Sequence, residues 1–366
     1  MVNKLRLLFK KLILFVPLFL LLVSCGVRAQ NNVTFALKGD KIFFAESDES
    51  VYWLSSIGGA ANPKYYIRSF NKEGKKNWEI SQTVSGGIFP LKSGEFFYAG
   101  ENGDITAYSK SGEELFKTHV DVSVNSNYML NSNEELVVNT ISSPTDFTVY
   151  SVININGEKT TSPEIKNLTT CFMHTYPLGG YIAEGFIDYD ETGGYTWYIY
   201  RLKDDFSIEW TYRTTNGDKN IYIADISKNG NILFSGSNYK MDIAFLKELD
   251  SQGEEINSVD YQKSNIVAAY FNEKIVVSAD KLRILSSDFT SLREFDAMLY
   301  TKIKVLEKSF FTYSPGSYSD FTKVVAVEYN GYCRQYDENN TLILNETYKS
   351  QGFTEISEDG KLYFIK

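Results

Sequence analysis

Two kinds of β-hairpin alternate along the chain, and this repeat is the feature that most constrains the fold. One kind joins its strands through a polar turn that often contains Gly, as in IRSFNKEGKKNWEI from Ile67, ITAYSKSGEELFKT from Ile105 and IAFLKELDSQGEEI from Ile243. The other has a tight Gly or Asn turn before a strongly apolar strand, as in LKSGEFFYAG and SKNGNILFSG. Gly and Asn suit such turns because they accept a positive φ.

Each pair of hairpins makes four antiparallel strands, and successive copies are 37 to 50 residues apart. A four-stranded unit with this period predicts an all-β propeller, because each blade buries its two faces against its neighbours. Residues 33–366 then form a single domain of seven blades, at about 48 residues per blade.

Eight blades are the alternative. The C-terminal segment GFTEISEDGKLYFIK resembles an inner hairpin without an outer one, so it could complete a blade begun at the N-terminus. The segment KVVAVEY before Asn330 is a further candidate strand. The 26 Tyr and 25 Phe residues are expected mostly in the core between blades, and Trp78 and Trp210 are expected there because they occupy the same post-turn position.

The N-terminus is typical of an exported lipoprotein. Basic residues precede the apolar run Leu12–Val23, whose twelve residues are too few to span a bilayer, which needs roughly 20. The following Leu22-Val23-Ser24-Cys25 resembles a bacterial lipobox. We therefore expect a signal peptide at 1–24, lipidation of Cys25 and a short tether at 25–32. Cleavage after Ala29 is the alternative.

Charge narrows the range of partners. Without residues 1–24 the chain has 33 basic and 46 acidic residues, a net charge of −13. Nucleic acid is excluded as an expected partner because phosphate binding needs clustered Lys and Arg, and the membrane is expected to be contacted only through the lipid. Gly26 follows Cys25 without an acidic run. By resemblance to Bacteroidetes-type lipoproteins, in which surface export needs acidic residues just after the Cys, we expect an outer-membrane lipoprotein that faces the periplasm.

The outer hairpin FNKEGKKNW (Phe70 to Trp78) resembles the repeat of PQQ-type quinoprotein propellers, and the architecture is PQQ-like or WD40-like. Together with the lipobox, the chain resembles propeller lipoproteins of Bacteroidetes-type bacteria. The resemblance implies the fold. It does not carry over the quinone cofactor, because the chain lacks the adjacent Cys pair that many quinone dehydrogenases use.

Few residues suggest catalysis. The chain has two His, His119 and His174, no GxSxG motif and no CxxC motif, and Cys171 and Cys333 are expected to be buried thiols. We therefore expect neither enzymatic activity nor a cofactor. The acidic group Asp188, Asp190 and Glu191 could hold Ca²⁺ through oxygen ligands, but a solvated loop is the favoured interpretation.

The loops between the second and third strands of the blades are predicted at Ser47–Pro63, Asp188–Gly194 and Pro315–Phe321. Loops commonly carry binding residues, and loop aromatics suit protein or sugar recognition. The predicted partner face contains Trp53, Asp188, Tyr189, Asp190 and Tyr318. The alternative for Tyr52 and Trp53 is that they belong to a strand and are buried. We expect a non-catalytic binding or scaffold protein of the cell envelope with a protein partner. The alternative is a carbohydrate-active protein, either a glycan binder or a hydrolase that uses loop carboxylates.

Overall fold

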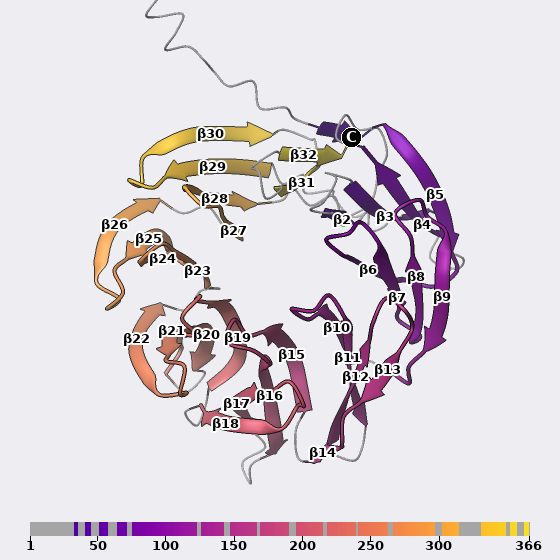
Figure 1. The fold of residues 1–366 in the computed structure, drawn as a ribbon. Helices are drawn as coiled ribbons and strands as arrows, with labels where there is room; N and C mark the ends of the chain where they lie inside the picture. Colours follow the sequence, from indigo (N-terminus) through magenta and orange to yellow (C-terminus); the bar gives the residue numbers. More distant parts are fainter. Residues whose placement is uncertain are drawn as a thin grey trace, which may run out of the picture.

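The computed structural model is an all-β ring (Figure 1). It describes residues 33–365 without 36–40, 45–50, 58–63, 72–74, 123–125, 143–146, 167–168, 190–194, 215–217, 239–240, 263–265, 297–301, 315–330, 349–351 and 357–361. Within these residues no helix is long and apolar enough to cross a membrane.

Seven consecutive antiparallel sheets of four strands form the blades, as the repeat predicts. Blade 1 contains β2 (Lys41–Phe44), β3 (Val51–Ile57), β4 (Lys64–Phe70) and β5 (Lys76–Gln82), and blade 2 contains β6 (Gly86–Pro90), β7 (Phe96–Gly100), β8 (Asp104–Tyr108) and β9 (Glu114–His119). Blade 3 contains β10 (Asn127–Leu130), β11 (Leu136–Ser142), β12 (Phe147–Ile153) and β13 (Lys159–Thr161). Blade 4 contains β15 (Thr169–Thr175), β16 (Tyr181–Tyr189), β17 (Tyr195–Leu202) and β18 (Ile208–Arg213). A short strand, β14 (Ile165–Lys166), also pairs with β12.

Blades 5 to 7 continue around the ring. Blade 5 contains β19 (Asp218–Ile226), β20 (Ile232–Asn238), β21 (Ile243–Leu249) and β22 (Glu255–Gln262). Blade 6 contains β23 (Val267–Phe271), β24 (Lys274–Ser278), β25 (Lys281–Leu285) and β26 (Ser291–Asp296). Blade 7 contains β27 (Lys302–Val305), β28 (Ser309–Ser314), β29 (Gly331–Asp337) and β30 (Leu342–Tyr348). In every blade the first strand lies nearest the axis and the fourth forms the rim (Figure 1).

An eighth sheet joins the two ends of the chain. It has three strands in the order β1 (Val33–Phe35), β32 (Leu362–Ile365) and β31 (Gly352–Ile356). The first of these pairs with β32 in parallel, and Val33 lies opposite Tyr363. The C-terminal hairpin therefore completes a sheet with the N-terminal strand, which closes the ring beside the seven four-stranded blades.

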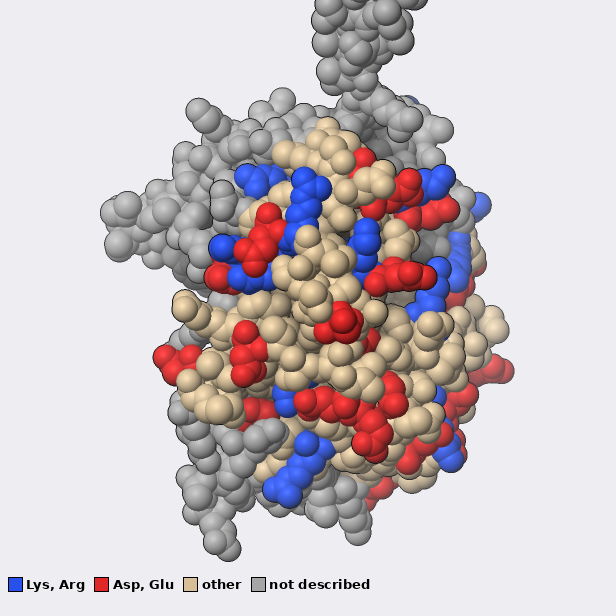
Figure 2. All heavy atoms as spheres, turned by 90° about the vertical axis from the view of Figure 1, so that its left-hand side faces the viewer, with Lys and Arg blue, Asp and Glu red and all other residues tan. Residues whose placement is uncertain are grey.

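The middle strands supply the core because both of their faces pack on neighbouring blades. All five residues of β7 are buried, whereas β9 and β18 at the rim alternate between exposed and half-buried positions. Figure 2 views the rim at the left of Figure 1, where acidic and basic side chains are interspersed. In blade 6, Arg283 of β25 pairs with Asp280 at 2.6 Å and with Glu294 of β26 at 3.0 Å.

Turns of two kinds share one end of the ring, which we call the turn face. Inner turns join the first and second strands of a blade, and outer turns join the third and fourth strands. The outer turns of blades 2 to 7 each contain one residue with positive φ, such as Gly112 (+85°), Gly157 (+84°) and Gly253 (+84°). The opposite end, with the second-to-third connections, is the loop face.

Neighbouring blades are joined where the rim strand of one blade meets the outer turn of the next. The indole N–H of Trp78 donates to the Lys110 carbonyl at 2.9 Å, and a Cβ on Gly112 would lie 3.0 Å from the ring. Trp210 repeats the arrangement with Ser251 at 3.2 Å, and there a Cβ on Gly253 would lie 2.8 Å from the ring. Both indoles therefore lie between blades, although each is only half-buried.

At two junctions the aromatic residue lies in the outer turn and the smaller residue lies on the rim strand. Blades 3 and 5 have Thr161 and Asn257 at the position of the Trp residues, and the following outer turns have Phe206 (φ +64°) and Phe289 (φ +62°) in place of Gly. Asn257 keeps the cross-blade hydrogen bond, to Ser287 at 2.8 Å. An aromatic ring thus occupies these junctions as well, contributed by the turn instead of the rim strand.

Candidate functional site

The structure corrects the position of part of the predicted partner face. The loop expected at Ser47–Pro63 contains strand β3, and Trp53 lies within it, opposite Ile42 and Arg68. The reason is the period-2 pattern of this segment, in which Tyr52 and Leu54 point into the core with 0% and 5% of their surface exposed. The Tyr52 hydroxyl donates to the Gly94 carbonyl at 2.5 Å, so this segment builds the contact between blades 1 and 2.

Asp188 and Tyr189 lie at the loop-face end of β16, at an irregularity in the pairing between Ile187 and Tyr189. They were predicted in a loop at Asp188–Gly194, whereas they are the last two residues of strand β16, because pairing with β17 continues as far as Tyr189 and Tyr195. Asp190, Glu191 and Tyr318 lie outside the described residues, as does Cys25, so their roles stay predictions. Within the described part of the chain, no three His, Cys, Asp or Glu residues are grouped closely enough to hold a metal.

A cavity of about 500 Å³ lies among the inner strands of blades 3, 4 and 5. These strands surround the axis of the ring in Figure 1. The walls are mostly apolar, and the polar side chains are those of His174, Thr175 and Asp225. Its apolar residues are Met129, Met173, Pro177, Ile223, Ala224 and Ile226. Because Pro177 belongs to an inner turn and Ile226 directly precedes one, the cavity lies at the turn-face end of the axis.

Two ionisable side chains, His174 and Asp225, line this cavity, and a third, Glu184, lies beside His174. His174 Nε2 lies 3.7 Å from Glu184 Oε2, too far for a hydrogen bond, and this buried nitrogen has no hydrogen-bond partner among the described residues. Glu184 is 2% exposed, and its Oε2 accepts the backbone N–H of Ile223 on the next blade at 2.8 Å. The imidazole is more open, with 39% of its side chain exposed.

Asp225 makes the equivalent contact between blades 5 and 6. Its Oδ2 accepts the N–H of Tyr270 at 2.8 Å, and Oδ1 accepts the N–H of Ile226 at 2.8 Å. Burial raises the pKa of the Asp225 carboxyl, and the two backbone donors and His174 only partly offset this. Glu184 and Asp225 thus satisfy N–H groups of strands that have no further strand beside them, so both carboxylates help to hold the inner strands in place.

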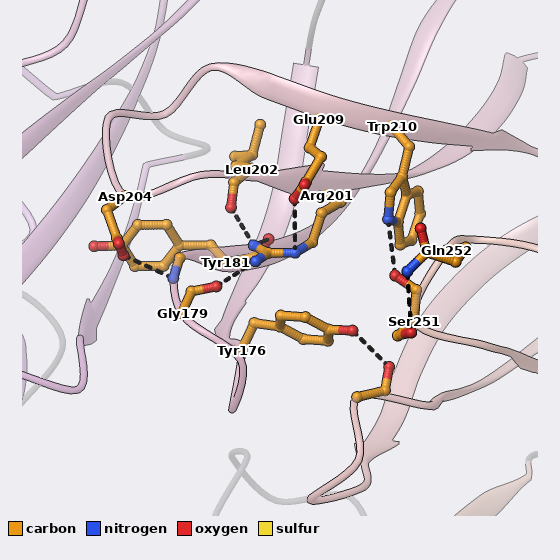
Figure 3. A network of polar contacts seen from close by, with 12 residues as sticks. Tyr176, Gly179, Tyr181, Arg201, Leu202, Asp204, Glu209, Trp210, Ser251 and Gln252 are labelled. Atoms are coloured by element: carbon orange, nitrogen blue, oxygen red, sulfur yellow. Dashed lines mark hydrogen bonds and ion pairs between the residues drawn. The ribbon is translucent and has the colours of Figure 1, made fainter.

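A network around Arg201 joins blades 4 and 5 (Figure 3). The guanidinium donates to the carbonyls of Gly179, Tyr181 and Leu202, and it lies 4.2 Å from the centre of the Tyr176 ring. The Tyr176 hydroxyl donates to the Gly230 carbonyl of blade 5 at 2.8 Å. Because Pro177 lies in the turn that this network fixes, one wall of the cavity is held rigidly.

Sequence reasoning assigned no role in a site to His174, and it did not identify Met129 or Asp225. Residues 129, 174 and 225 belong to three different blades, so no local motif connects them. The only signal in the sequence is that each lies in the first strand of a repeat, next to an inner turn. Cys333 is buried in β29, as expected.

Comparison with models of known protein families and with curated proteins finds no match. Among solved structures, the Dos1 propeller is similar with a TM-score of 0.55 and 12% identity, over 88% of this chain and 90% of that one. A eukaryotic initiation factor has a TM-score of 0.51 and 8% identity over 90% of both chains. BamB from Moraxella catarrhalis has a TM-score of 0.39 and 10% identity, over 76% and 96%. At these identities the first two similarities show one thing, that the chain has a β-propeller fold.

Proposed function

We propose that this protein is a lipid-anchored, non-catalytic binding protein of the cell envelope, and that it receives a segment of a partner protein at the turn-face end of the ring. The single observation that carries the docking proposal is the cavity of about 500 Å³ among the inner strands of blades 3 to 5.

The lining of the cavity supports a protein ligand. Met129 and Met173 have flexible, polarisable side chains that adapt to different apolar surfaces, and they lie beside the rigid Pro177. Binding sites of this kind combine an apolar wall with a few polar groups that fix orientation. Here His174 and Asp225 are those polar groups. An apolar side chain of a partner would fill the cavity, and the surrounding turns would contact its backbone.

The envelope part of the proposal comes from the sequence. A basic and apolar N-terminus followed by the lipobox-like Leu22-Val23-Ser24-Cys25 supports lipid attachment at Cys25. The absence of an acidic run after Cys25 supports a periplasmic orientation at the outer membrane. A ring tethered in this way would remain near the membrane and offer its faces to other envelope proteins.

The test is affinity capture of the full lipidated chain after chemical cross-linking in the cells that produce it. The informative variant combines Met129→Gln and Met173→Gln, which keep the side-chain length and make the wall polar. Met241→Gln is the matched control, because Met241 is 60% exposed in the connection between β20 and β21 at the loop face. We expect the double variant to lose a partner that the control retains. Equal recovery of every protein by both variants would contradict docking in the cavity.

A further inference from the structure

A second cavity lies at the turn face between blades 3 and 4. Its volume is about 390 Å³, and it lies between the inner turn 131–135 and β13 on one side and Gly180, Tyr181 and the outer turn 203–207 on the other. None of its lining residues also lines the cavity near the axis. We call it the junction cleft.

The junction cleft lies at one of the two junctions where the aromatic residue lies in the outer turn. Thr161 occupies the position that Trp78 and Trp210 hold elsewhere, so no indole covers the outer turn from the rim side. Phe206 from that turn instead stacks between Tyr150 and Tyr181, with ring centres 4.6 and 4.9 Å away and planes within 8° and 6° of parallel. The stacked rings form a rigid wall, and the space beside the small threonine remains open.

Three carboxylates line the junction cleft, and each uses one oxygen within the protein. Glu135 Oε2 accepts Asn131 Nδ2–H at 2.8 Å, Asp204 Oδ1 accepts the Gly180 N–H at 2.7 Å, and Asp205 Oδ1 accepts the Ser207 N–H at 2.9 Å. The second oxygen of each carboxylate has no hydrogen-bond partner among the described residues. A carboxylate oxygen only accepts hydrogen bonds when ionised, so these oxygens suit ligands with several donors.

The remaining lining selects the ligand further. The side chains of Ser132, Asn133 and Thr160 can donate as well as accept, whereas the Ser162 hydroxyl donates to the Pro163 carbonyl at 2.9 Å and accepts the Tyr150 N–H at 3.0 Å. Among the described residues, no Lys, Arg or His lines the cleft. A phosphorylated or carboxylated ligand would meet the carboxylates without a compensating cation and is disfavoured. A simple cation would leave the hydroxyl and amide donors unused. A ligand whose hydroxyls both donate and accept matches the whole lining.

We propose that the junction cleft binds a neutral oligosaccharide. The sugar hydroxyls donate to Glu135, Asp204 and Asp205 and accept from the serine, threonine and asparagine side chains, while the C–H groups contact the edges of Tyr181 and Phe206. The volume falls within the range of small-ligand pockets, roughly 300–1,000 Å³. This inference goes beyond the proposed function, because it concerns a different cavity and a different class of ligand, and either proposal could fail alone.

The test is saturation-transfer difference NMR and titration calorimetry on the full lipidated chain in detergent. The probes are N,N′-diacetylchitobiose and cellobiose as neutral sugars, and spermidine as a cation without hydroxyls. We expect saturable binding of at least one disaccharide and no competition by spermidine. Asp205→Asn removes the charge but keeps an oxygen for the Ser207 N–H, and we expect it to weaken binding of the disaccharide by roughly tenfold.

Asp288→Asn is the matched control. Asp288 directly precedes Phe289, as Asp205 precedes Phe206, and it also accepts hydrogen bonds within its own turn, from Ser286 and Thr290. This control should bind the disaccharide like the unmodified protein. Three results would overturn the proposal: neither disaccharide binds at millimolar concentration, spermidine binds and displaces the disaccharide, or Asp205→Asn binds as tightly as Asp288→Asn.

Discussion

Replacing Trp210 by Ala tests how the blades are held together. Replacing a fully buried Trp or Phe by Ala lowers the free energy of unfolding by about 3–5 kcal/mol. The Trp210 indole is only half-buried at the junction of blades 4 and 5, so we expect the free energy of unfolding to fall by about 2 kcal/mol. About 1 kcal/mol of this is the hydrogen bond to the Ser251 carbonyl. Trp210→Phe keeps part of the ring contact and should cost about 1 kcal/mol.

The partner position supplies a sharper test. Gly253 has φ +84°, and a Cβ there would lie 2.8 Å from Trp210 Cδ2, so Gly253→Ala combines backbone strain with a steric clash. Removing the indole relieves the clash and leaves the strain. The double variant Trp210→Ala, Gly253→Ala should therefore be more stable than the sum of the single effects predicts, by about 1 kcal/mol.

The assay is urea denaturation of the full chain, followed by circular dichroism. Thr161→Ala is the control at the equivalent position of blade 3, where the ring comes from Phe206 instead, and it should change the free energy of unfolding by less than about 0.5 kcal/mol. Additive effects of Trp210→Ala and Gly253→Ala, or a loss below about 0.5 kcal/mol for Trp210→Ala, would refute this account of the junction.

Three further predictions concern charge, closure and anchoring. A hydrogen bond from the buried Arg68 lowers the pKa of Glu79, so this pair stabilises the fold above the ordinary carboxyl pKa and the contribution is lost as pH falls through the lowered value. Glu79→Gln should therefore cost about 1 kcal/mol at pH 7, allowing for solvent screening, and progressively less under acid conditions in the same urea assay; a cost independent of pH would contradict this. Deleting residues 352–366 removes β31 and β32 and should lower the urea midpoint, whereas an unchanged midpoint would show that the closing sheet adds no stability. Cys25→Ala should abolish labelling by a palmitate analogue and release the protein from membranes, and retention of the variant in the membrane fraction would refute lipidation.

The repeat was readable in the sequence because its signals are local. Gly112, Gly157 and Gly253 mark outer turns, and alternating apolar residues mark the strands, so each blade follows from residues that are close together in the sequence. The closing sheet is different, because it pairs Val33 with Tyr363 from opposite ends of the chain. At Phe206 and Phe289 the repeat spacing predicts the turn, but the residue type does not predict the positive φ, which is unusual for a bulky residue. Only the structure shows that at these junctions the aromatic ring comes from the outer turn of one blade instead of the rim strand of its neighbour.

The candidate site was harder to predict for the same reason. Aromatic residues near a turn suggested that Trp53 lay in a loop, whereas alternating burial of Tyr52 and Leu54 places the segment in β3. The axial cavity brings together Met129 and Asp225, which are nearly a hundred positions apart in the sequence and belong to different blades. A site whose residues come from the inner strands of several repeats produces no fixed spacing in the sequence, so no motif reveals it.

Site-specific photo-crosslinking tests partner binding at the turn face most directly. The photoreactive residue p-benzoylphenylalanine would replace Leu178, which is 57% exposed in the inner turn next to Pro177, and in a separate variant Met241, which is 60% exposed at the loop face. After irradiation of intact cells, we predict that the Leu178 variant gives a discrete cross-linked protein and the Met241 variant does not. A cross-linked protein from Met241 alone, or from neither position, would contradict docking at the turn face.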